Sequence, residues 1–135
     1  MSTTVFLELP VSDLARSKRF YTDLGWELHP VLSGEHAGAV LIGGTEHVMV
    51  LSPDRHRCPL GGSAMGTPAG SSVVNAISVD SPEQVDTVVE RALRAGATEG
   101  ETQDYGFLRS RCFHDPDGHQ WEVLWMDPEA QRPES

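Results

Sequence analysis

The most constraining feature of this sequence is an order of secondary-structure elements that occurs twice. A strand, a helix, a further strand and a hairpin are expected in the first half, and the same order returns about 70 residues later. The two copies start with strands over residues 5–11 and 73–79, and their hairpins join 39–42 to 47–51 and 109–113 to 120–125. Internal repetition at this scale constrains the fold more than any single element does, so we predict an α+β chain of two similar modules.

Both helices carry the residues that start and stop helices. The first is expected from about Asp13 to Leu24. The second has Ser81 as its N-cap, Pro82 at the first helical position and Gln84 placed to complete a capping box. Gly96 then ends it, because glycine readily adopts the backbone conformation that terminates helices.

The chain is expected to form a single domain with two modules. Module one spans about residues 1–52, module two spans about residues 73–127, and a loop of about residues 53–72 joins them. The loop is rich in proline and glycine, which is typical of a linker; a mobile lid over a site is the alternative. Cys58 and Cys112 lack the spacing of a metal or redox motif and are expected to be free thiols.

Composition disfavours several classes of function. The formal charge of -10, from 20 acidic and 10 basic residues, argues against nucleic-acid binding, because phosphates would be repelled. The same charge suits a cationic small ligand, although solubility alone also explains it. No apolar run of membrane-spanning length and no signal peptide is visible. We therefore expect a cytoplasmic protein without a membrane or nucleic-acid partner.

The closing hairpin holds the most informative side chain. An Asp/Gly turn over residues 115–118 leads into a strand in which Glu122 alternates with Trp121 and Val123. An ionised carboxylate that is half-buried in a sheet is costly unless it is paired or bound to something. Glu122 is therefore the first candidate for a functional residue, in binding or in catalysis.

Four segments resemble the vicinal oxygen chelate superfamily, which includes glyoxalase I, bleomycin-resistance proteins and extradiol dioxygenases. Residues 9–21 are similar to its opening strand and helix, and residues 115–122 to its closing hairpin. Residues 78–80 and 103–107 look most like a subgroup described as predicted lactoylglutathione lyases. The resemblance covers nearly the whole chain and implies two βαβββ modules whose curled mixed sheet forms an open cup for a ligand. It does not specify the reaction, since this fold hosts many chemistries.

The resemblance also implies where relatives hold a metal, with one ligand on each of four strands. The corresponding positions here are Phe6, Val50, Val74 and Glu122, and the hairpin before Val50 gives no sharp anchor for its register. Phe and Val have no lone pair to donate, whereas zinc, nickel or iron normally needs three or more protein ligands. We therefore expect no metal ligands, no cofactor and no standard glyoxalase I reaction. A divalent metal is left open through a relocated set built from Glu8, Glu122 and a histidine.

Several other residues can be interpreted in two ways. Glu8 shares the strand face of the first ligand position, where it would meet a ligand or bond to its own chain. Arg109 and Arg111 would bind an anionic group if their face lines the cup, and would otherwise be solvated. Tyr105 and Phe107 are expected in a connecting loop, where they would close over a ligand or simply join two strands.

The leading hypothesis is a protein that binds a small organic molecule without a metal, as in drug or toxin sequestration. Its site would be lined by Phe6, Glu8, Val50, Val74, Tyr105, Phe107 and Glu122. Whether the protein is an enzyme stays open. One alternative is a metal-independent lyase or isomerase with Glu122 as general base, and the other is a metal-dependent lyase or dioxygenase with the relocated ligands. A homodimer is expected, because a second copy would cover the edges and open face of the sheets.

Overall fold

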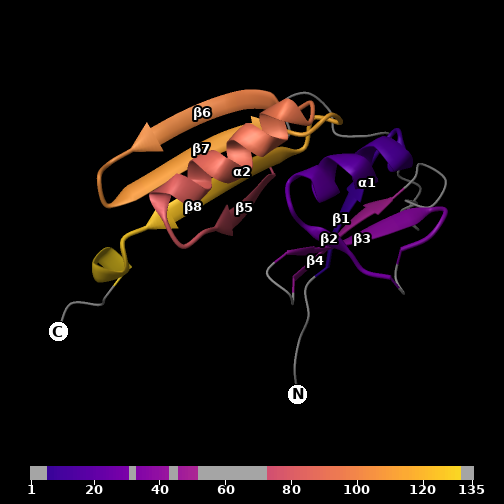
Figure 1. Cartoon of the computed structure of the whole chain (residues 1–135), viewed down its shortest axis with the longest axis horizontal. Coiled ribbons are helices and arrows are strands. Elements are labelled where there is room, and N and C mark those ends of the chain that lie inside the picture. Colours follow the sequence, from indigo (N-terminus) through magenta and orange to yellow (C-terminus); the bar gives the residue numbers. More distant parts are fainter. Residues whose placement is uncertain (1–5, 31–32, 43–45, 52–72, 132–135) are drawn as a thin grey trace, which may run out of the picture. The chain divides into compact units, whose positions relative to one another are not determined.

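The computed structural model of the chain describes residues 6–30, 33–42, 46–51 and 73–131. Contacts divide the chain into two compact units, which we call unit 1 (residues 1–69) and unit 2 (residues 70–135). Figure 1 colours both units along the sequence. Within the described ranges, no helix combines the length and the apolar character needed to cross a membrane.

The described residues of unit 1 form a four-stranded sheet and one helix. Its elements are β1 (Phe6–Pro10), α1 (Leu14–Asp23), β2 (Glu27–Leu28), β3 (Ala37–Ile42) and β4 (Glu46–Leu51). The strand order is β1-β4-β3-β2, with β1 parallel to β4 and the remaining neighbours antiparallel. The parallel pair exists because α1 carries the chain back to the start of the sheet before β4 is reached.

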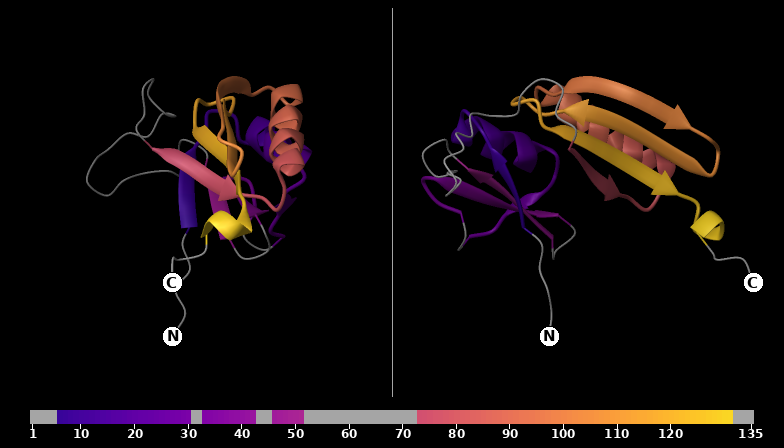
Figure 2. Two further views of the ribbon diagram at one scale, coloured as in Figure 1. Left: turned by 90° about the vertical axis from the view of Figure 1, so that its left-hand side faces the viewer. Right: turned by 180° about the vertical axis from the view of Figure 1, so that it is seen from behind.

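Unit 2 repeats this plan. Its elements are β5 (Val74–Ser78), α2 (Pro82–Arg94), β6 (Thr98–Asp104), β7 (Leu108–His114) and β8 (Gln120–Met126), followed by the short 3₁₀ helix η1 (Pro128–Gln131). The strand order β5-β8-β7-β6 is that of unit 1, again with one parallel pair. Figure 2 shows α2 lying along one face of this sheet. The predicted repeat and the α+β class are confirmed.

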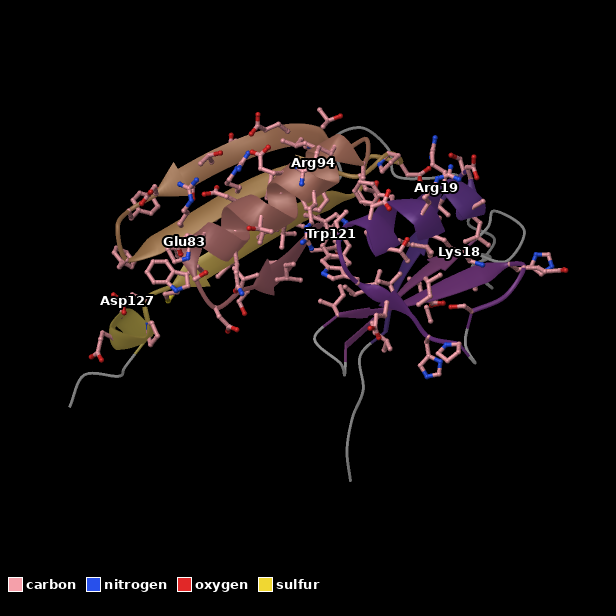
Figure 3. The ribbon with its side chains drawn as sticks, viewed as in Figure 1. Lys18, Arg19, Glu83, Arg94, Trp121 and Asp127 are labelled. Atoms are coloured by element: carbon pink, nitrogen blue, oxygen red, sulfur yellow. The ribbon has the colours of Figure 1, made fainter. Side chains whose placement is uncertain are left out.

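The capping residues of α2 act as predicted from the sequence, with one difference in the hydrogen bond of Gln84. The Ser81 hydroxyl accepts a hydrogen bond from the backbone N–H of Gln84 at 3.2 Å. The Gln84 side chain reaches one residue further back than in a standard capping box, and accepts from the N–H of Asp80 at 2.8 Å. Glu83 in the first turn and Arg94 in the last turn, both labelled in Figure 3, have the charges that favour the helix dipole.

The core of unit 2 lies between α2 and its sheet. Val85, Val89 and Ala92 of α2 are fully buried. From the sheet, Trp121 and Phe113 are also buried, with nearly parallel rings whose centroids are 6.3 Å apart. Burying each large apolar side chain contributes about 1.5–3 kcal/mol. Trp121 is therefore part of the core beneath the helix.

Arg109 and Arg111 of β7 hold α2 and β6 on one side of the sheet. Their partners are two carboxylates of α2 and two of β6, namely Asp86, Glu90, Glu99 and Asp104. Arg111 Nη1 lies 3.1 Å from Asp86 Oδ1 and 3.0 Å from Glu90 Oε1. Its Nη2 lies 2.6 Å from Glu99 Oε2, and Arg109 Nη2 lies 2.6 Å from Asp86 Oδ1. The two arginines are therefore structural, and the hypothesis that they bind an anionic ligand in a cup is wrong.

The charges of this cluster reinforce one another. The hydrogen bond from Arg109 is the main reason that the pKa of Asp86 is lowered, and it outweighs partial burial, which acts in the opposite direction. Burial by itself lowers the pKa of Arg111, but hydrogen bonds to Glu99, Glu90 and Asp86 outweigh it, so the net pKa is raised. The ionised forms of Asp86 and Arg111 are therefore both favoured by their contacts in the cluster.

We predict that Arg111→Met lowers the free energy of unfolding by about 1–3 kcal/mol, because three carboxylates lose their shared partner. Urea unfolding followed by circular dichroism measures the effect. Arg94→Met removes the same charge from the exposed end of α2 and is expected to change stability by only about 0.5 kcal/mol. Equal losses in the two variants would show that the cluster does not hold the helix to the sheet.

Candidate functional site

One face of the sheet of unit 2 is covered by α2, and we call the opposite face the open face. The ion pairs of Arg111 with α2 place that side chain on the covered face. Its partner in the antiparallel register is Val123, which is fully buried. Because side chains alternate along a strand, Glu122 lies on the open face, opposite Trp121 and Val123. This agrees with the alternation expected from the sequence.

Glu122 has room around it on the open face. Its register neighbours are Ala76 on β5 and Cys112 on β7, both of which have short side chains. The residue is half-buried. Within the part of the chain that the structure describes, its carboxylate makes no hydrogen bond or ion pair. A half-buried carboxylate in such a setting is available to an external partner.

Strand β6 approaches Cys112 through an irregularity in its pairing with β7. The register between β6 and β7 shifts between Glu99 and Thr102, so the strand bulges at Gly100 and Glu101. The bulge brings the backbone close to Cys112, since a Cβ added at Gly100 would lie 3.0 Å from the Cys112 Cβ. Glycine is required there because any larger residue would push the strands apart.

The pKa of the Cys112 thiol depends on its burial and on the negative charges around it. Its pKa is raised, first by burial and then by the negative charges of Glu122 and Glu101. The thiol is therefore protonated at neutral pH, and it does not serve as a nucleophile or as a metal-binding thiolate in this state. Ala76, Glu122, Cys112 and Glu101 form a row across the four strands of unit 2, which we call the carboxylate row.

Three members of this row, Ala76, Cys112 and Glu101, are not among the site residues predicted from the sequence. Cys112 could have been found by counting outward from the turn over residues 115–118, because that turn sets the pairing of Cys112 with Glu122. Glu101 gave no such signal. It joins the row because β6 bulges, and no local sequence pattern predicts the register shift between Glu99 and Thr102.

The Asp/Gly motif before Glu122 has a structural role. Asp115 Oδ1 accepts hydrogen bonds from the backbone N–H groups of Asp117 and His119, each at 2.9 Å. Gly118 has a φ of 90°, which L side chains rarely adopt. Asp115 and His119 are buried. The turn therefore fixes where β8 begins and, through the register, where Glu122 stands.

The structure of unit 1 contradicts the face predicted for Val50. A Cβ added at Gly38 would lie 3.0 Å from side-chain atoms of both Lys18 on α1 and Val50 on β4, so Val50 faces the helix. It is fully buried, and the prediction that Val50 lines the open face is wrong. The register instead pairs the exposed Glu8 with Met49. A slip of one residue reverses the faces of a strand, and the hairpin before β4 gave no anchor against it.

The other predicted site residues lie as follows. Phe6 starts β1, in register with His47, and the side chains of both are outside the described part. Val74 is on the open face of β5 and is 48% exposed. Tyr105 and Phe107 lie in the turn between β6 and β7, with exposed rings stacked 6.3 Å apart. That any of them contacts a ligand stays a prediction.

Two of the metal-ligand positions implied by the resemblance can be compared on the open face of unit 2. Glu122 has an oxygen donor there, and Val74 has no donor atom. Val50 faces the helix, so it is not the residue that β4 presents on the other face of its sheet. Among the residues that are described, no three His, Cys, Asp or Glu side chains come together in a group that could hold a metal ion.

Comparisons with known proteins agree with the geometry. The family profile of the Glyoxalase/Bleomycin resistance protein/Dioxygenase superfamily matches residues 4–123. No protein with a curated description matches the chain. The lactoylglutathione lyase subgroup suggested by two short segments is not confirmed.

Solved structures with the same fold come from several bacteria. A glyoxalase/bleomycin resistance protein/dioxygenase from Nocardioides is 27% identical, with a TM-score of 0.70, and the match covers 100% of this chain and 89% of that one. A glyoxalase-related enzyme from Fulvimarina pelagi is 23% identical, with a TM-score of 0.75 and coverage of 93% and 88%. The fosfomycin resistance protein FosX from Mesorhizobium loti is 17% identical, with a TM-score of 0.72 and coverage of 97% and 98%.

We predict that Glu122→Gln speeds the alkylation of Cys112 by iodoacetamide at about pH 8 by about two- to threefold. Removing the neighbouring charge lowers the pKa of the thiol, and the thiolate is the form that reacts. Peptide mass spectrometry follows Cys112 separately from Cys58. Glu83→Gln removes a charge from α2 instead and is expected to leave the rate unchanged; a rate in Glu122→Gln no faster than in this control would place Glu122 away from Cys112.

Proposed function

This chain belongs to the Glyoxalase/Bleomycin resistance protein/Dioxygenase superfamily, and from that premise we propose that it binds a small organic molecule on the open face of unit 2. Glu122 is the polar group that orients the molecule. The single observation that carries this proposal is that Glu122 is half-buried, flanked by short side chains and without a bond to any described residue.

The composition of the open face supports binding. Val74 and Leu124 supply apolar surface beside Glu122, and Ala76 and Cys112 leave space next to its carboxylate. Small-molecule sites are mostly apolar and carry a few placed polar groups that fix orientation. Tyr105 and Phe107 are exposed enough to add aromatic contact at one end of the sheet.

We propose that binding does not require a metal. A zinc, nickel or iron centre needs several nitrogen, oxygen or sulfur ligands, and the two equivalent positions in unit 2 supply one carboxylate, from Glu122, and no donor from Val74. Cys112, the nearest potential soft ligand, is kept as a thiol by its raised pKa. The protein side chains, and not a Lewis acid, would therefore orient the bound molecule.

A metal-independent lyase or isomerase is the second candidate. The observation that favours it is the same unpaired state of Glu122 among the described residues, because a general base must be free to take a proton from the substrate. Two of the similar solved structures are fosfomycin resistance proteins. That description supports a role in protection from a toxic small molecule, by sequestration or by conversion.

We predict that native mass spectrometry of the full chain, purified without chelators, shows a bound small molecule whose occupancy falls about tenfold in Glu122→Gln. The matched control Glu83→Gln is expected to retain it. Recovery of the same molecule after long incubation with fresh protein supports sequestration, and a product that forms only when Glu122 is present supports catalysis. Equal occupancy in Glu122→Gln and Glu83→Gln would contradict the proposed site.

We further propose that the protein is a cytoplasmic homodimer. The free thiol of Cys112 suits a reducing compartment. Strand β5 is an edge strand, and Val73 next to it is 63% exposed. An apolar edge of this kind invites a second copy to cover it.

Light scattering coupled to size exclusion is predicted to give twice the chain mass of 14.7 kDa. Val73→Lys is expected to shift the protein toward the monomer, because a charged residue at a strand edge opposes pairing. Thr87→Lys adds the same charge on the exposed side of α2 and is expected to leave the dimer intact. A monomeric wild-type chain would refute the dimer.

A further inference from the structure

We propose that Ser110 is a specificity-determining residue of the binding site on the open face of unit 2, and that the ligand presents a carboxamide-like group there. The C=O of this group accepts a hydrogen bond from the Ser110 hydroxyl, and its N–H donates one to Glu122. This inference rests on the proposed binding site and adds both a second residue that binds the ligand and the chemistry of the group that is bound.

Ser110 lies on the open face of β7. Arg109 and Arg111, on either side of it in the strand, bond to α2 and therefore lie on the covered face. Because side chains alternate along a strand, the side chain of Ser110 points to the opposite face. The antiparallel registers pair it with Gln103 on β6 and Leu124 on β8. Ser110 therefore stands in the middle of the open face, between side chains that are longer than its own.

The hydroxyl of Ser110 belongs to a buried residue. Ser110 is only 2% exposed. Within the residues that the structure describes, this hydroxyl makes no hydrogen bond to a backbone or side-chain group. A buried polar group without a partner costs free energy, and buried polar side-chain atoms in proteins are in the large majority bonded. Alanine has nearly the same size and would avoid this cost, so a ligand that bonds to the hydroxyl explains why a serine stands here.

Ser110 and Glu122 occupy diagonal positions of one strand pair. Ser110 pairs with Leu124, and Cys112 pairs with Glu122, so these four residues form the corners of one patch. Diagonal neighbours in an antiparallel sheet are about 7–8 Å apart, which one ligand group that bonds to both side chains can span. The other two corners are a leucine and a short thiol. They supply apolar contact and leave space for the group between them.

The two polar corners need opposite hydrogen-bonding groups from the ligand. The negatively charged carboxylate of Glu122 can only accept hydrogen bonds, so the ligand must donate to it. The Ser110 hydroxyl has a hydrogen with no acceptor among the described residues, so the ligand must accept there. A carboxamide supplies the acceptor and the donor on neighbouring atoms. A ketone would satisfy Ser110 but would cover Glu122 without donating to it, which is unfavourable.

Two probes of nearly equal size and shape test the assigned group: hydrocinnamamide and benzylacetone, which carry NH₂ and CH₃ on the same carbonyl. Each is titrated into the ¹⁵N-labelled full chain while the backbone amide signals of Ser110 and Glu122 are followed by NMR. Hydrocinnamamide is expected to bind about tenfold more tightly, because only its N–H donates to the carboxylate. Equal affinities of the two probes would overturn the assignment.

The Ser110→Ala variant separates a ligand-binding hydroxyl from a structural one. It is expected to weaken both probes about fivefold, because both use their C=O at Ser110. The same variant is expected to raise the Tm of the unliganded protein by about 2–4 °C, since a buried hydroxyl without a partner is lost. Ser78→Ala removes an exposed hydroxyl from β5 and is expected to leave the Tm unchanged. A lower Tm in Ser110→Ala would show that the hydroxyl stabilises the protein itself, and would overturn the proposal.

A second variant distinguishes this inference from the proposed function. Glu122→Gln is expected to weaken hydrocinnamamide about fivefold and to leave benzylacetone nearly unchanged. If Glu122→Gln has this effect but Ser110→Ala binds both probes like the wild type, the role of Ser110 is wrong and the binding site at Glu122 stands. If neither probe moves the two signals, the carboxamide inference is wrong, and the Glu122 dependence of the molecule retained through purification decides the proposed function separately.

Discussion

The ion pairs between Arg111 and α2 determine which face of the second sheet is available to a ligand. They place one side of β7 under the helix, and the antiparallel register carries that assignment to Trp121 and Val123 on β8. Side-chain alternation then leaves Glu122 on the opposite face. The same cluster holds the arginines of β7 on the covered side, so one set of contacts both fixes the fold and leaves the open face without their positive charge.

In the carboxylate row, Glu122 stands at a metal-ligand position implied by the resemblance, but the residues around it differ from a metal-binding set. The resemblance implies that, in metal-dependent relatives, the residue equivalent to Glu122 binds a metal ion together with ligands from other strands. Here Val74 cannot donate, Cys112 is held as a thiol by its raised pKa, and Glu101 arrives from a bulge in β6. The result is an open face on which Glu122 stands beside a protonated thiol and short side chains.

The sequence predicted those features that depend on neighbouring residues. Helix caps such as Ser81 and the pairing set by the Asp115 turn are local, because a few side chains bond to nearby backbone groups. Val50 was misplaced because the hairpin before it has no comparable turn signal, and one residue of error exchanges the two faces. The partners of Arg111 and the approach of Glu101 join segments that are distant in sequence or shifted by a bulge, which no local pattern reveals.

The central claim is that this chain uses Glu122 to hold an organic ligand and not a metal ion. Elemental analysis by plasma mass spectrometry, on protein purified without chelators and then dialysed, tests it most directly. We predict that zinc, nickel and iron are each present far below one ion per chain, and that Glu122→Gln does not change those values. One ion per chain that survives dialysis in the wild type and is lost in Glu122→Gln would contradict the account.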